Sequence, residues 1–101
     1  MSPKDERGWS MSSDKLADCR RQIDQLDLKL VDLLNARTEV VHEIGRIKRQ
    51  FSLPVYEPKR EDQVFENVTG HNPGPLTPEA LKRIFERIID EMRTIQQKKM
   101  S

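Results

Sequence analysis

The sequence is poor in cysteine and histidine, and this excludes several kinds of site. Its one cysteine, Cys19, cannot form a disulfide within the chain. His42 and His71 are the only histidines, so no cysteine and histidine cluster has the spacing of a zinc site. A disulfide scaffold, a metal site and a thiol–histidine protease are therefore excluded, and we expect neither a metal nor a cofactor.

Long apolar runs and an excess of charge of one sign are also missing. No stretch approaches the roughly 18 apolar residues of a membrane span, and residues 1–14 contain no apolar signal-peptide core. The 18 basic and 17 acidic residues leave a net charge of +1, which gives no bulk attraction to nucleic acid or to an anionic membrane. We expect a cytoplasmic protein that binds neither nucleic acid nor a membrane.

Charged and apolar residues each make up 35 % of the 101 residues, whereas globular domains are about 45–50 % apolar and about 25 % charged. The chain therefore has the length of one domain but few apolar side chains with which to form a core alone. Residues 1–12 are polar and predict a disordered leader. The domain itself is predicted over residues 13–98.

A seven-residue apolar repeat begins at Leu16 and predicts one amphipathic helix from about Asp14 to about Gln50. Its two rows are Leu16, Ile23, Leu30 and Ile44, and Cys19, Leu26, Leu33, Val40 and Ile47. About 37 residues would span about 55 Å, whereas a domain of this size has a radius of gyration near 13 Å. Such a helix needs a second chain to lie on.

Two shorter helices are predicted after the break at residues 52–54. Pro58 can occupy the first turn of one, which Gly70 ends, and Thr77 followed by Pro78 is a good start for another that runs to about Gln97. No strand-like alternation occurs. The predicted fold class is all-α, a three-helix chain with one very long first helix that forms a dimer.

Three basic residues interrupt or flank the apolar rows of the first helix. Arg37 occupies an otherwise apolar row, where a guanidinium is desolvated unless an anion meets it. Lys48 lies about three turns further on and within about 20° of the same face, so both cations could converge on one small dianion. Alternatively, Arg37 pairs with a carboxylate of another helix and Lys48 is an ordinary solvated lysine.

Arg20 precedes Arg37 by roughly 25 Å along the helix axis. Both side chains therefore cannot touch one small molecule from the same chain. Either Arg20 reaches the site from the partner subunit, or it forms a surface pair with Asp24.

The later helices contribute further polar residues on apolar faces. Glu61 follows Arg60 on the apolar side of the second helix, although Glu57 and Glu61 could merely complement the helix dipole. Gln96 falls on the apolar stripe of the third helix, where its amide could donate to a buried site or where the helix end could fray. Together these residues suit a small, multiply anionic ligand and the stabilisation of moving charge, without covalent or acid–base chemistry.

Five ordered motifs carry a resemblance to a known family. They are Arg20-x-x-Ile23-Asp24-x-x-Asp27, Leu33-Leu34-Asn35-Ala36-Arg37, Ile44-Gly45-Arg46-Ile47-Lys48, Pro54-Val55-Tyr56-Glu57-Pro58-Lys59-Arg60-Glu61, and Phe85-x-x-Ile88-Ile89 before Gln96. Over about residues 14–98 the chain resembles the all-α class of chorismate mutases, which convert chorismate to prephenate in phenylalanine and tyrosine biosynthesis.

The resemblance implies an intertwined homodimer with two equivalent sites. Arg37 of one chain and Arg20 of the other would grip the two carboxylates of chorismate. Lys48 and Gln96 would donate hydrogen bonds to the ether oxygen, which gains negative charge as its bond to carbon breaks. Glu61 would accept a hydrogen bond from the ring hydroxyl.

The resemblance also implies that Glu57 and Arg60 help to hold the hydroxyl end of the substrate. Two positions depart from the family. Well-studied members have aspartate where this chain has Glu57, and some place a serine against a substrate carboxylate where this chain has Met92.

Two alternatives share the fold. Isochorismate–pyruvate lyases eliminate pyruvate from a similar substrate, but Glu61 favours the mutase because that branch lacks a carboxylate at this position. The other is a non-catalytic, regulatory mutase-like dimer, against which the retained polar residues argue. Mutase domains are often fused to another enzyme of the aromatic pathway, so fusion to or association with such an enzyme stays open.

Overall fold

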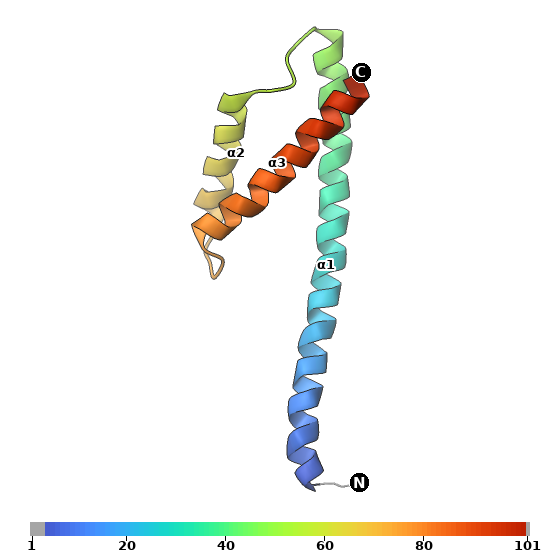
Figure 1. Ribbon diagram of the computed structural model, residues 1–101, viewed down its shortest axis with the longest axis vertical. Helices are drawn as coiled ribbons and strands as arrows, with labels where there is room; N and C mark the ends of the chain where they lie inside the picture. The colour runs from blue at the N-terminus through green and yellow to red at the C-terminus, as the bar shows by residue number, and fades with distance from the viewer. Residues whose placement is uncertain (1–3, 101) are drawn as a thin grey trace. The chain divides into compact units, whose positions relative to one another are not determined.

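The computed structural model describes the backbone of residues 4–100 and the side chains of residues 13–98. It contains three helices, α1 (Lys4–Gln50), α2 (Pro58–His71) and α3 (Pro78–Met100) (Figure 1). No strand occurs among the residues described. The prediction of an all-α chain with three helices and one very long first helix is confirmed.

The ends of two helices differ from the prediction. α1 begins at Lys4 rather than at about Asp14, so the described part of the predicted disordered leader is helical. No proline interrupts this stretch, and extending an existing helix costs far less than nucleating one. Residues 1–3 lie outside the described residues. α3 likewise runs beyond about Gln97, to Met100.

The end of α1 determines where the chain turns back. Ser52 adopts a left-handed backbone with φ 56°, and the backbone N–H of Leu53 donates to the carbonyl of Lys48 at 2.7 Å. The N–H of Ser52 donates to the carbonyl of Arg49 at 3.3 Å. This is the pattern of a Schellman cap, and it directs the following linker back alongside the last turns of α1.

The predicted starts of α2 and α3 are confirmed. Pro58 and Pro78 are the first residues of their helices, where a proline loses no hydrogen bond. Thr77 caps α3, because its hydroxyl oxygen accepts from the backbone N–H of Ala80 at 3.1 Å. α2 and α3 contact one another and form a helical hairpin (Figure 1).

The chain divides into two compact units, which are residues 1–36 and residues 37–101. In the first unit, every side chain described from Ser13 to Ala36 is largely solvent-exposed except Ala17. The exposed residues include much of the predicted apolar repeat, namely Leu16, Ile23, Leu26, Leu30 and Leu33.

The second unit holds the buried core. Val41 of α1 and Ile89 and Met92 of α3 are only 5 %, 8 % and 7 % exposed. The Thr38 hydroxyl donates to the Met92 sulfur at 3.5 Å, so the last part of α1 packs on α3. Within the described residues, no helix is both long and apolar enough to cross a membrane.

Candidate active site

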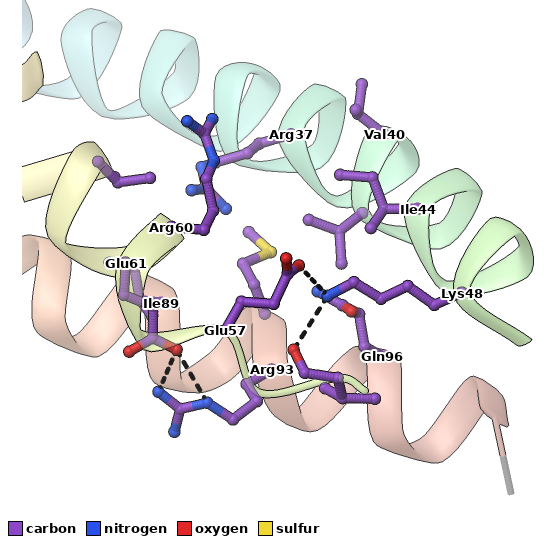
Figure 2. Close-up of a pocket in the computed structure, with 14 residues that line it drawn as sticks. Arg37, Val40, Ile44, Lys48, Glu57, Arg60, Glu61, Ile89, Arg93 and Gln96 are labelled. Carbon is purple, nitrogen blue, oxygen red and sulfur yellow. Dashed lines mark hydrogen bonds and ion pairs between the residues drawn. The ribbon is translucent and has the colours of Figure 1, made fainter. Parts of the chain in front are cut away.

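A pocket of about 270 Å³ opens in the second unit, where the last part of α1, the linker, the start of α2 and the end of α3 converge (Figure 2). Small-molecule sites commonly measure about 300–1,000 Å³, so this pocket suits a small ligand. Valine, isoleucine and methionine side chains form its apolar wall. Its charged and amide residues are Arg37, Lys48, Glu57, Arg60, Glu61, Arg93 and Gln96.

Arg37 and Arg60 bring two positive charges together in this pocket. Burial lowers the pKa of the Arg37 guanidinium, and the positive charge of Arg60 lowers it further. Arg60 contacts Gln63, with Nη1 3.4 Å from Oε1. Among the residues described, neither arginine has a carboxylate partner. The pair is therefore a ready receptor for an anionic group.

Lys48 is the buried cation of the site. It is 7 % exposed, and its Nζ donates to the Val55 carbonyl at 3.0 Å and lies 2.6 Å from Oε1 of Glu57 (Figure 2). These contacts offset the cost of burying the charge. An ammonium has three N–H donors, so Lys48 is held in place while one donor remains for a ligand.

Glu57 thus makes a contact that the sequence did not predict. Glu57 is the residue immediately before α2, and its carboxylate reaches across the pocket to Lys48 (Figure 2). The resemblance had implied that it helps to hold the hydroxyl end of a substrate. The structure adds a second candidate role, which is to orient Lys48.

Gln96 contributes an amide with unused hydrogen-bonding capacity. Its side-chain oxygen is buried and has no hydrogen-bond partner among the described residues. A half-turn of the amide exchanges its oxygen and nitrogen, so this position can present an acceptor or a donor. Because buried polar atoms are usually paired, the orphaned atom indicates a place for a polar ligand group.

Arg93 is a pocket residue that the sequence did not predict. Its Nη2 and Nε lie 2.5 and 3.1 Å from Oε2 of Glu61 (Figure 2). In the sequence, Arg93 adjoins the apolar stripe of α3 and has Asp90 three residues before it, which is typical of a surface ion pair. No local signal indicates the contact with Glu61, because the two residues belong to different helices.

Six of the seven predicted site residues therefore line one pocket, and Arg20 does not. Arg20 lies on α1 in the first unit and is exposed. The four basic and two acidic side chains of the pocket leave its lining with a net charge of +2. This charge suits a small dianion.

Comparisons with known proteins agree with this geometry. The sequence profile of chorismate mutase type II matches residues 19–97. The chain is 33 % identical over 89 residues to the bifunctional chorismate mutase/prephenate dehydratase of Aquifex aeolicus, covering 84 % of this chain and 25 % of that protein. The chain thus spans about a quarter of the length of this curated relative.

Solved structures show the same fold. Chorismate mutase (form II) from Thermus thermophilus has a TM-score of 0.81 and 30 % identity, over 82 % of this chain and 94 % of that chain. Chorismate mutase from Helicobacter pylori in complex with prephenate has a TM-score of 0.79 and 30 % identity, over 86 % and 94 % of the two chains. The chain belongs to the chorismate mutase type II family.

Proposed function

We propose that this chain catalyses the rearrangement of chorismate, a dicarboxylate, to prephenate. The observation that carries the proposal is the pocket with a net charge of +2, in which Arg37 and Arg60 lie together without a carboxylate partner among the described residues. The Helicobacter pylori relative, solved in complex with prephenate, supports the same ligand class.

The reaction is intramolecular and needs no nucleophile, so the pocket has two tasks. The first is to hold chorismate in a chair-like conformer that brings the two reacting carbons together. Arg37 would bind one carboxylate, and Arg60 lies beside it. Glu61 would accept a hydrogen bond from the ring hydroxyl.

The second task is to stabilise the charge that develops on the ether oxygen as its bond to carbon breaks. Lys48 would donate from its remaining N–H, and Gln96 would donate from its amide. Lys48 is in place before the ligand binds, because it is held by Val55 and Glu57. Preorganised donors of this kind each contribute about 3–4 kcal/mol to barrier lowering.

We further propose that the site is completed by a second copy of the chain. The exposed apolar row of the first unit, which includes Leu16, Ile23 and Leu30, is the surface that a partner would cover. Arg20 lies on the same unit. From there it would enter the partner's pocket and bind the second carboxylate.

Mixing two inactive variants tests this shared site. Arg20→Ala and Arg37→Ala should each be nearly inactive as homodimers. Refolded together at equal amounts, they should recover about a quarter of wild-type activity, because half of the dimers are mixed and each mixed dimer holds one intact site. No recovery would argue that Arg20 and Arg37 act in the same chain, and an active Arg20→Ala homodimer would show that Arg20 plays no part.

The activity itself is tested by incubating the purified protein with chorismate and, separately, with isochorismate. Prephenate formed from chorismate is the expected result. Free pyruvate from isochorismate as the main product would instead indicate the lyase. No turnover of either substrate by a folded protein would leave a non-catalytic regulatory dimer.

Several bifunctional relatives join a chorismate mutase to a prephenate dehydratase in one chain, as the Aquifex aeolicus protein does. We propose that this domain works with another enzyme of aromatic amino acid biosynthesis, as a fused or an associated partner. Prephenate released by the pocket would be that enzyme's substrate.

A further inference from the structure

Arg93 of α3 is the one basic residue of the pocket that the proposed mechanism leaves without a role. Its Nη2 and Nε lie 2.5 and 3.1 Å from the same carboxylate oxygen of Glu61, Oε2. The two side chains are 28 % and 23 % exposed. An ion pair with two contacts and partial burial is more strongly held than an exposed surface pair.

Two further contacts fix the guanidinium of Arg93. The ring of Tyr56 lies against it, with 5.1 Å between the Arg93 Cζ and the ring centroid, which is within the range of a cation–π contact. Nη1 lies 3.3 Å from Oδ1 of Asp90. The hydrogen bond with Glu61 is also the main cause that raises the pKa of Arg93. Arg93 is therefore charged and oriented.

The contact with Arg93 involves only one of the two carboxylate oxygens of Glu61. Oε2 receives both N–H groups of Arg93, whereas Oε1 has no partner among the residues described. Anchoring Oε2 restricts where Oε1 can lie, because the planar carboxylate holds its two oxygens at a fixed separation. Glu61 lines the pocket, so its second oxygen is available to accept a hydrogen bond from a ligand.

We propose that Arg93, supported by Tyr56, is a positioning residue that holds Glu61 so that Oε1 accepts the hydrogen bond of the substrate's ring hydroxyl. The proposal rests on the proposed function. It assigns a role to a residue that contacts another side chain rather than the reacting atoms. Lysine could not replace arginine fully, because an ammonium lacks the fork that makes two directed contacts with one oxygen and a flat face for Tyr56.

The test compares two ligands that differ only in the hydroxyl. Calorimetric titration would measure the affinity for prephenate and for a prephenate analogue without the ring hydroxyl, in the wild type and in Arg93→Gln. We expect Arg93→Gln to lose about tenfold in affinity for prephenate, the value of one hydrogen bond to a charged group. Its affinity for the analogue should be unchanged.

Matched variants separate positioning from a structural effect. Arg87→Gln removes another arginine of α3, which is 77 % exposed and paired with Glu91, and should change neither affinity. Arg93→Lys should recover part of the loss. Glu61→Gln should lose the same preference for the hydroxyl, and adding Arg93→Gln to it should cost nothing more.

Steady-state kinetics give a second readout. A contact made equally in the ground state and the transition state changes KM and leaves kcat nearly unchanged, so Arg93→Gln should raise KM about tenfold with kcat within about twofold. Equal losses for both ligands, or additive effects of Arg93→Gln and Glu61→Gln, would overturn the role of Arg93. Failure of the wild type to bind prephenate would overturn the proposed function too, and the wild-type titration alone reveals it.

Discussion

The two units of the chain differ in what they bury. From Ser13 to Ala36 the leucine and isoleucine side chains of the predicted repeat are exposed, Leu33 by 66 %. From Arg37 onward the structure buries Val41, Ile89 and Met92 and, with them, the charged side chain of Lys48. The first unit thus exposes apolar side chains, whereas the second unit buries a charged side chain.

The contrast separates two kinds of requirement. An exposed apolar row is costly in water and is stabilised by a partner surface, so the first unit indicates assembly. A buried ammonium is costly unless it is paired, and Lys48 is paired with Glu57 of the same chain. The second unit therefore carries a candidate site in which Lys48 is already held in place. The following changes test these two assignments, from the largest expected effect to the smallest.

Leu26→Asp places a charge in the second exposed apolar row of the first unit, which also contains Leu33. If this row is a dimer interface, burying an unpaired carboxylate costs about 3–5 kcal/mol, so association should weaken by about a hundredfold to a few thousandfold and turnover should be lost with it. Sedimentation velocity and a chorismate assay measure both effects. Gln25→Asp, at an exposed position beside the row, is the control, and a Leu26→Asp dimer with normal activity would contradict the assignment.

Lys48→Ala removes the buried donor of the second unit. Loss of one preorganised donor costs about 2.7–4 kcal/mol of transition-state stabilisation, so kcat should fall about a hundredfold or more. The fold should remain, because Glu57 is 49 % exposed and can be hydrated when unpaired. Arg46→Ala, which removes an exposed cation of α1, should have little effect. Near-normal turnover of Lys48→Ala would remove Lys48 from the mechanism.

Gln96→Glu converts the orphaned amide of the second unit into a group that titrates. The neutral carboxyl can donate to the ether oxygen, whereas the ionised form repels the charge that develops there. We expect about a hundredfold loss of kcat/KM at neutral pH that is recovered as the pH falls toward the usual glutamate pKa of about 4.3. A variant with the same pH profile as the wild type would show that Gln96 does not face the reacting oxygen.

Gly45→Ala probes the helix that both units share, with the smallest effect. A Cβ at this position would lie 3.9 Å from Cγ of Gln96, which is an ordinary contact. Alanine is favoured over glycine inside a helix by about 1 kcal/mol, so the free energy of unfolding should rise by up to this amount. Denaturant unfolding at a fixed protein concentration measures it, and a destabilised variant would indicate tighter packing around Gln96.

The apolar periodicity and the capping residues predicted the three helices, because both features depend on residues that are close together in the sequence. The apolar repeat from Leu16 and the caps at Pro58 and Thr77 act over one or two helical turns, so three helices could be predicted. The start of α1 could not, because the polar composition of residues 1–12 is also that of a disordered leader. Lys4 rather than Asp14 is its first residue.

Most polar residues of the pocket were predictable from the sequence, but their pairing was not. Arg37, Lys48 and Gln96 interrupt or flank apolar faces, which is a signal in the sequence itself. The pairs Lys48 with Glu57 and Arg93 with Glu61 form between different segments of the chain. Their partners depend on how the segments pack, so a single helical pattern does not identify them.

The net charge of +2 on the pocket lining has a kinetic consequence. A field that draws in a dianion accelerates its capture, and salt screens that field. The proposed rearrangement conserves both carboxylates, so the product leaves against the same field that attracted the substrate. Added salt should therefore slow capture and hasten release, and the salt concentration at which turnover is fastest reflects the balance between the two.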